Sequence, residues 1–275
     1  MCNISALDTA LTGSIFAGKV HFARITESTN SDAMAAARNG AVHGSVWVAD
    51  EQTAGRGRGD HRWHSAAGEG LYVSVLLRPS FSAERLPLVP LAAGLAAAEA
   101  IGSVTGLSID LRWPNDLLIG PRKVGGILVE SQISSKSPSH AVAVVVGIGI
   151  NVHQRSFAPD LATAATSLDL ETGKRVSRRE VLTALLRSLQ RETAAMADEP
   201  QAGRIPPRVE QHSSWARGRR VEVHGPQACS GTTAGLDGNG FLLVATASGL
   251  VTVHTGGIRA AVESPGNQGR DRMPG

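Results

Sequence analysis

The chain has 275 residues, of which 42% are hydrophobic and 19% charged, and its formal net charge at pH 7 is +3. This composition excludes a largely disordered or low-complexity chain, and the length suits one sizeable domain with a small second one, since domains commonly run about 100 to 200 residues. Because no block of lysines and arginines is present, the weak positive charge suits anionic small molecules better than nucleic acid.

The N-terminal residues and the cysteines predict a cytoplasmic location. The first 18 residues contain Asp8 and lack a basic segment, so they do not form a signal peptide. We expect no run of about 18 apolar residues that would span a bilayer. Cys2 and Cys229 lie at opposite ends of the chain, without the spacing of a metal site or a disulfide framework, which is typical of a reducing compartment.

The first half of the chain predicts a mixed sheet backed by helices. A short helix with a polar N-cap and a glycine stop is expected within residues 26–40, and a helix of small apolar residues within 86–101. Strands are expected over residues 45–50, 71–77, 109–113, 123–133 and 141–152. The last of these has β-branched residues on both faces, which indicates burial on both.

The second half predicts one long helix and a small β-domain. Ser177 and Glu180 form a capping box before an amphipathic helix that ends near Met196, and the Pro/Gly-rich residues 200–207 indicate a linker with a boundary near Gln211. The remaining short strands alternate with turn pairs and predict a β-barrel of about 50 residues. These strands are expected over residues 218–225, 231–237, 240–246 and 250–258.

The segment GRGRGDHRW, residues 55–63, carries the strongest chemical signal. Glycines let a backbone close around an anion, and guanidiniums bind carboxylate or phosphate with two hydrogen bonds while keeping their charge. Arg56 and Arg58 are therefore candidates to bind two different anions. A solvated flexible loop, an RGG-like nucleic-acid segment or an accidental integrin-type tripeptide would explain the same residues.

Two further segments, RWPNDLLIG (112–120) and KVGGILVE (123–130), contain the next candidate binding residues along the chain. Pro114 ends a strand, so Asn115 and Asp116 stand where ligands approach an α/β sheet. Asp116 is a candidate to bind Mg²⁺ or to orient an amine, and Lys123 to neutralise charge on a phosphoryl group. A plain turn and a surface lysine are the alternative interpretation.

The segment GIGINV, residues 147–152, lacks the spacing of a dinucleotide-binding turn. Its glycines instead predict a thin sheet face, against which a ligand or a neighbouring backbone can lie.

Together and in this order, ESTN (27–30), QTAGRGR (52–58) with Trp63, WPND (113–116), KVGGILVE and GIGIN resemble the biotin protein ligases over roughly residues 20–262. The resemblance implies an α+β fold with a mixed-sheet, class II synthetase-like catalytic domain, shared with lipoate ligases, and a C-terminal SH3-like β-barrel. The implied parts are an N-terminal extension (1–20), a catalytic domain (21–210), the barrel (211–262) and a disordered tail (263–275).

The resemblance also implies a two-step reaction. Biotin is activated by ATP with Mg²⁺ to biotinyl-5'-AMP, and is then transferred to a lysine of a biotin carboxyl carrier protein of the acetyl-CoA carboxylase type. No tightly bound prosthetic group and no membrane contact are expected. Specific DNA binding is not expected either, because the residues before the first motif are too few for a helix-turn-helix domain. A lipoate–protein ligase of the same fold and a non-catalytic biotin sensor are the alternatives.

Site residues follow from the positions that match the family motifs. Biotin is assigned to Ser28, Thr29, Asn30, Gln52, Gly55, Arg56, Gly57, Arg58, Lys123 and Gly126. ATP is assigned to Arg58, Trp63, Asn115, Lys123 and Asn151. Catalysis is assigned to Lys123, Arg56 and Asp116, and Mg²⁺ to Asp116. The chain departs from the family pattern at Gly59-Asp60-His61, and at Arg112, where lysine is common.

Overall fold

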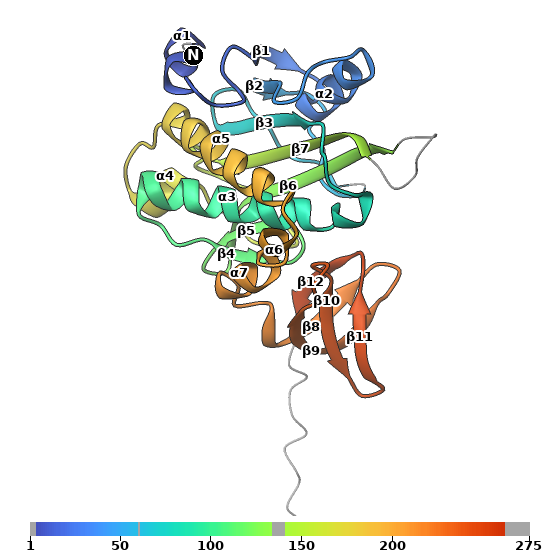
Figure 1. Ribbon diagram of the computed structural model, residues 1–275. Coiled ribbons are helices and arrows are strands. Elements are labelled where there is room, and N and C mark those ends of the chain that lie inside the picture. The colour runs from blue at the N-terminus through green and yellow to red at the C-terminus, as the bar shows by residue number, and fades with distance from the viewer. Residues whose placement is uncertain (1–3, 60, 134–140, 262–275) are drawn as a thin grey trace, which may run out of the picture.

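The computed structural model describes residues 4–59, 61–133 and 141–261 (Figure 1). The predicted tail, Asp60 and Cys2 lie outside these residues. A mixed seven-stranded sheet with the order β1-β2-β3-β7-β6-β5-β4 forms the centre of the larger part. Its strands are β1 (Val20–Thr26), β2 (Val46–Gln52), β3 (Gly70–Leu77), β4 (Asp110–Arg112), β5 (Asp116–Ile119), β6 (Arg122–Ile133) and β7 (Ala141–Asn151). Strands β1 and β2 are parallel, and the other neighbours are antiparallel.

Helices cover both faces of this sheet (Figure 1). They are α1 (Ile4–Ala10), α2 (Thr29–Arg38), the short η1 (Ala83–Arg85), α3 (Leu88–Thr105), α4 (Leu168–Thr172), α5 (Arg178–Ala195), α6 (Glu199–Ala202) and α7 (Ile205–Gln211). One face of β7, with Val144 and Val146, joins the main core with α3 and α5. The opposite face, with Ala143 and Val145, packs on α2. The expected burial of this strand on both faces is confirmed.

Helix α3 differs from the expectation that no segment could span a bilayer. Its 18 residues have a mean hydropathy of 1.5, enough by length and composition to cross a membrane, and it is the one such helix among the described residues. However, 67% of it is buried inside the protein, and it packs against α5 and the sheet. Its apolar character is therefore that of a core helix.

The linker predicted over residues 200–207 is wrong, because this segment forms most of α6 and the first turn of α7. Proline fits the first turn of a helix, where its missing N–H has no helical partner, so Pro200 and Pro206 begin helices here. Helix α7 is fixed to α5 by Arg208, whose guanidinium pairs with the buried carboxylate of Glu192 at 2.6 and 2.8 Å. The sequence pattern also missed α1, β1 and β5.

A five-stranded antiparallel sheet, in the order β11-β10-β9-β8-β12, completes the structure. Its strands are β8 (Arg217–His224), β9 (Cys229–Leu236), β10 (Leu242–Thr246), β11 (Gly249–Val253) and β12 (Gly257–Ala260), so residues 250–258 form parts of two strands rather than one. The Trp113 indole donates to the carbonyl of Gly240 at 3.0 Å and joins the two sheets. Gly240 has φ +83° and packs on α3, where a side chain would collide with Leu91. The predicted α+β architecture is confirmed.

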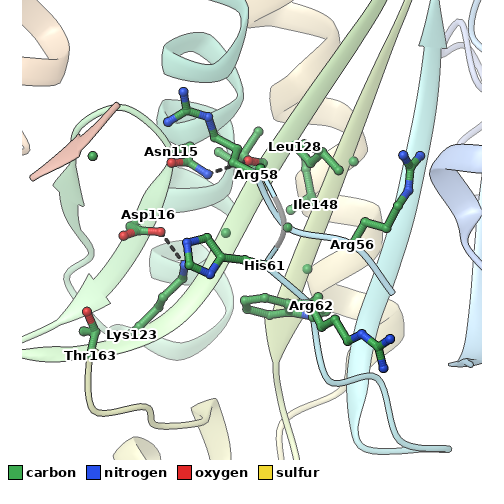
Figure 2. Close-up of a pocket in the computed structure, with 18 of the residues that line it drawn as sticks. Arg56, Arg58, His61, Arg62, Asn115, Asp116, Lys123, Leu128, Ile148 and Thr163 are labelled. Carbon is green, nitrogen blue, oxygen red and sulfur yellow. Dashed lines mark hydrogen bonds and ion pairs between the residues drawn. The ribbon is translucent and has the colours of Figure 1, made fainter. Parts of the chain in front are cut away.

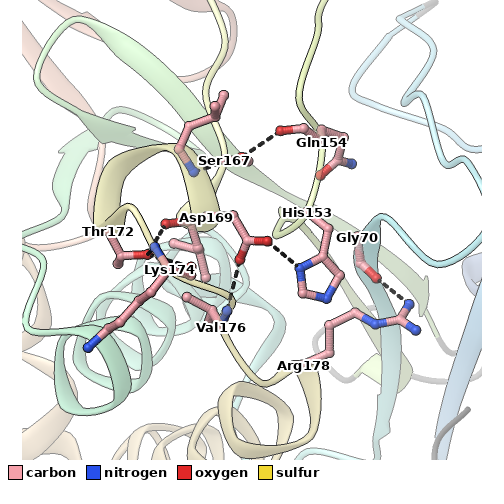
Figure 3. A network of polar contacts seen from close by, with 11 residues as sticks. Gly70, His153, Gln154, Ser167, Asp169, Thr172, Lys174, Val176 and Arg178 are labelled. Carbon is pink, nitrogen blue, oxygen red and sulfur yellow. Dashed lines mark hydrogen bonds and ion pairs between the residues drawn. The ribbon is translucent and has the colours of Figure 1, made fainter.

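A polar network fixes the segment between α4 and α5 behind the end of β7 (Figure 3). Asp169 accepts a hydrogen bond from the backbone of Val176 at 2.8 Å and lies 2.9 Å from His153 Nδ1. Arg178, the first residue of α5, donates to the carbonyl of Gly70 at 3.1 Å and pairs with Asp50. The start of α5 is therefore held against β2 and β3.

The cap of α5 gives a test of this local structure. The Ser177 hydroxyl accepts from the backbone N–H of Glu180 at 3.3 Å, so Ser177→Ala should lower the free energy of unfolding by about 1 kcal/mol. Urea unfolding followed by circular dichroism measures the change. Ser177→Asp, which keeps an acceptor oxygen, is the matched control, and equal losses in the two variants would contradict the cap.

Candidate active site

A cavity of about 690 Å³ opens beside the N-terminus of α2. Strands β6 and β7 form its floor, and one wall comes from residues 56–59 and 61–63 of the segment 55–63, called the Gly/Arg loop below. A second wall comes from the C-terminal sheet, at His224 and at Thr255 and Gly256 between β11 and β12. The cavity is therefore built from segments distributed along most of the chain.

Glycines on β7 make room for this cavity. A side chain at Gly149 would lie 2.6 Å from the Trp63 ring, and one at Gly147 would collide with the Asn30 amide. Gly126 on β6 also lies under Trp63, with 3.6 Å between its ideal Cβ and the ring. The prediction of a thin sheet face is confirmed, although side chains rather than a backbone lie against it.

One end of the cavity is a buried, uncharged hydrogen-bonding set. The Gln52 Oε1 accepts from the backbone N–H and the hydroxyl of Thr29 at 2.9 and 3.1 Å, and Gln52 Nε2 donates to Ser65 at 2.8 Å. The Ser74 hydroxyl lies 2.7 Å from Thr29 Oγ1 and 2.6 Å from Asn30 Oδ1. These groups are held by one another, since Thr29 and Asn30 are each 4% exposed and Ser74 is fully buried.

The Ser28 side chain stands where it could serve either as the N-cap of α2 or as a ligand-binding group. It occupies the N-cap position of α2, but its hydroxyl makes no capping hydrogen bond. Ser28 is buried and lines the cavity. Its position therefore fits a ligand-facing group better than a cap.

Arg56 pairs with a protein carboxylate. Its Nη2 lies 2.7 Å from Glu130 Oε2, and the same oxygen accepts from Asn30 Nδ2 at 2.8 Å. Glu130 ends the KVGGILVE segment, but the motif gave it no role. The predicted anion-binding arginine is thus joined to the uncharged end of the cavity through Glu130.

Asp116 holds two cations on the other side of the cavity, where Figure 2 shows it beside Lys123. Arg112 donates to Asp116 Oδ2 from Nε at 3.0 Å and from Nη2 at 2.6 Å, while Lys123 pairs with Oδ1. Arg112 also donates to Thr163 at 2.9 Å. Burial alone would raise the pKa of Asp116, but the Lys123 and Arg112 charges outweigh it and hold the pKa below its usual range.

Arg58 joins the Gly/Arg loop to the C-terminal sheet. Its Nη1 donates to the carbonyl of Gly256 at 2.7 Å, and its Nη2 lies 3.5 Å from Thr255 Oγ1. Burial lowers the pKa of Arg58, and the nearby Asp116 carboxylate opposes that shift. The loop closes on itself where Gly57 N–H donates to His61 at 2.7 Å.

Asn115 and Asn151 fix backbone around the cavity. The Asn115 amide donates to the carbonyl of Ile127 at 2.8 Å, and Asn151 donates to the carbonyl of Thr166 at 3.0 Å. Both residues line the cavity, and one hydrogen bond from each side-chain amide fixes its position.

All but one of the site residues predicted from the sequence line this cavity. They are Ser28, Thr29, Asn30, Gln52, Arg56, Gly57, Arg58, Trp63, Asn115, Asp116, Lys123, Gly126 and Asn151. Gly55 is the exception, because it lies at the base of the loop, where a side chain would meet Ser65 Oγ at 2.7 Å. Sequence reasoning missed Ser74, Glu130 and Thr163, of which Ser74 gave a signal as the lone polar residue of the buried strand β3.

Comparison with known proteins places these features in a family. Residues 22–151 match the biotin/lipoate A/B protein ligase family. The chain is 33% identical over 240 residues to the bifunctional ligase/repressor BirA of Bacillus spizizenii, covering 85% of this chain and 71% of that protein. It is 31% identical over 238 residues to the biotin–[acetyl-CoA-carboxylase] ligase of Mycobacterium tuberculosis, covering 85% of each.

The structure agrees with a solved relative. The biotin protein ligase of Aquifex aeolicus in complex with biotin and ATP superposes with a TM-score of 0.75 at 30% identity, covering 88% of this chain and 98% of that one. The chain belongs to the biotin protein ligases. Conservation of the fold across both sheets means that the C-terminal wall of the cavity is part of the ligase architecture.

The magnesium role predicted for Asp116 stays a prediction. In this structure its Oδ2 accepts from Arg112 and its Oδ1 pairs with Lys123. Asp116 is therefore the counter-ion of two cations.

The low pKa of Asp116 gives a prediction for the pH dependence of stability. The folded state favours the ionised form, so this contribution is complete above the usual pKa near 3.8 and is lost as pH falls through the lower folded-state value. At neutral pH, Asp116→Asn should lower the free energy of unfolding by roughly 3 kcal/mol, because two part-buried cations lose their partner.

Urea unfolding of Asp116→Asn and of the unchanged protein from neutral to acid pH measures this difference. The gap between the two should narrow once the pH falls below about 3.8. The exposed Asp160 supplies the control, since Asp160→Asn should show no such gap. A gap that stays constant down to the lowest pH would contradict the assignment.

Proposed function

We propose that the chain activates biotin with ATP to biotinyl-5'-AMP and transfers the biotinyl group to a lysine of a biotin carboxyl carrier protein. The observation that carries the proposal is the division of one cavity into an uncharged hydrogen-bonding end, at Gln52, Thr29 and Asn30, and a cationic end, at Arg58 and Lys123. Biotin has a neutral urea at one end and a carboxylate at the other, so both ends find matching groups.

The charge balance supports a reaction between two anions. Around Asp116 lie three cations, Arg58, Lys123 and Arg112. Two positive charges therefore remain uncompensated, which suits a carboxylate meeting a triphosphate. A biotin carboxylate oxygen attacks the α-phosphorus, the bond from that phosphorus to the β-phosphate oxygen breaks, and pyrophosphate leaves. Lys123 and Arg58 stabilise the charge that develops on the phosphoryl oxygens.

In the second step, a carrier lysine amine attacks the carbonyl carbon of the mixed anhydride. The carbon–oxygen bond to the phosphate breaks, AMP leaves with that oxygen, and the nitrogen gives up its proton to water. The low pKa of Asp116 keeps its carboxylate ionised. Asp116 is therefore better suited to accept a hydrogen bond from the amine than to retain the proton that the amine loses. It becomes available to the amine as Lys123 turns toward the phosphate.

The relatives support this proposal. The Mycobacterium tuberculosis relative is a biotin–[acetyl-CoA-carboxylase] ligase, and the Aquifex aeolicus structure contains biotin and ATP. A lipoate ligase would have less use for the Gln52 and Thr29 hydrogen bonds, because lipoic acid has no ureido ring. A non-catalytic sensor would have no need of Lys123 beside Asp116.

Biotin-dependent exchange between ATP and pyrophosphate tests the first step. We expect exchange with biotin and none with lipoic acid at the same concentration. Biotinylation of a purified carrier protein domain then tests the second step. Exchange that depends on lipoic acid instead would establish the lipoate alternative, and biotin binding without exchange would establish the sensor.

Lys123→Ala should weaken biotin binding by about tenfold, the size of one lost charge-assisted hydrogen bond, and should lower the rate of adenylate formation by a further factor of about a hundred, because the lysine also acts on transition-state charge. Calorimetry with biotin and single-turnover release of pyrophosphate measure the two effects. Lys174→Ala, at an exposed lysine, is the matched control. Pyrophosphate release at the control rate would rule out this role for Lys123.

A further inference from the structure

Glu130 on β6 connects two parts of the cavity wall that are far apart in sequence. Its Oε2 accepts from Arg56 at 2.7 Å, across 74 residues, and from Asn30 at 2.8 Å, across 100 residues. The Asn30 amide also donates to the carbonyl of Leu128 at 3.3 Å and is seated over Gly147. One carboxylate oxygen thus joins the Gly/Arg loop to the buried hydrogen-bonding end of the cavity.

We propose that Glu130 is a positioning residue that anchors the Gly/Arg loop through Arg56 and holds the Asn30 amide at the biotin end. Arg56 then acts through Glu130 and is not the counter-ion of the biotin carboxylate. This inference rests on the proposed function and deepens it, because it assigns the carboxylate to the other cationic groups of the same cavity.

Charge balance favours this division of roles. The Arg56 charge is already paired with Glu130, so the pair is neutral. Arg58 and Lys123 lie near the Asp116 carboxylate, which also pairs with Arg112. Positive charge is therefore in excess around Asp116. Figure 2 shows Arg56 on one side of the view and the Asp116–Lys123 pair on the other. The carboxylate of an incoming biotin is therefore attracted to Arg58 and Lys123 and not to Arg56.

The hydrogen bonds also favour an anchor. The loop begins at Gly55, whose carbonyl accepts from Trp63 N–H at 2.9 Å and whose Cα has no room for a side chain. Arg56 follows at once, and Glu130 connects it to the almost fully buried Asn30. Asn30 cannot shift without losing several hydrogen bonds to its buried neighbours. It therefore holds Glu130 in place, and Glu130 in turn holds Arg56.

Calorimetry with biotin and with its alcohol analogue, in which CH₂OH replaces the carboxylate, tests the proposal. Glu130→Ala and Arg56→Ala should each weaken both ligands alike, by about tenfold, the size of one lost charge-assisted hydrogen bond. The double variant should be no weaker than Glu130→Ala alone, because Arg56 acts only through Glu130. Glu130→Gln, which keeps an acceptor for Asn30, should lose less.

Three calorimetric results would overturn the assignment. If Glu130→Ala tightened biotin but not the alcohol, Glu130 would compete with the ligand carboxylate. If Arg56→Ala weakened biotin but spared the alcohol, Arg56 would be its counter-ion. Unchanged binding of both ligands in Glu130→Ala would show that the pair positions nothing.

Limited trypsin digestion of the full chain without ligand gives an independent readout. Glu130→Ala should be cut faster after Arg56, Arg58 or Arg62 than the unchanged protein. Glu99→Ala, which breaks the exposed Arg191 pair between α3 and α5, is the matched control. Equal digestion rates would contradict the anchor. Failure of the unchanged protein to bind biotin would instead refute the proposed function, whereas normal binding with unaffected variants would refute this inference alone.

Discussion

The alternation of side chains along β7 is the constraint on which both the core and the cavity depend. A strand sends successive side chains to opposite faces, so a single residue sequence must satisfy two environments at once. One face is continuously branched and apolar and supports the helical layer. The other changes from small apolar residues to Gly147 and Gly149, where Asn30 and Trp63 occupy the space that side chains would need. Packing and ligand access are thus separated by one residue along the strand.

Uncharged and charged groups occupy different ends of the cavity. The hydrogen-bonding end contains uncharged groups whose donors and acceptors are satisfied by one another, which avoids the cost of burying unpaired polar atoms. At the cationic end, Asp116 is the shared counter-ion of Arg112 and Lys123. Such an arrangement holds like charges close together before any substrate is bound, and its dipoles need little reorganisation during the reaction.

The sequence predicted the elements well where periodicity and caps are local signals, as at Ser177 and along β7. It failed at residues 200–207, because proline both ends helices and begins them, and only packing on α5 decides which. Motifs identified which residue types meet in the site, but not their partners. Several carboxylates could have paired with Arg56, and the choice of Glu130 depends on how β6 is placed beside α2. The roles assigned to individual site residues came from residue chemistry and from the family resemblance, neither of which fixes the partners of a side chain.

The contact between Arg58 and the Gly256 carbonyl spans 198 residues of sequence. During translation, the ribosome must therefore complete both sheets before this wall of the cavity can close. Until these residues are made, the cavity lacks the wall that Thr255 and Gly256 provide. Synthesis of the last small sheet is thus the step that completes the site.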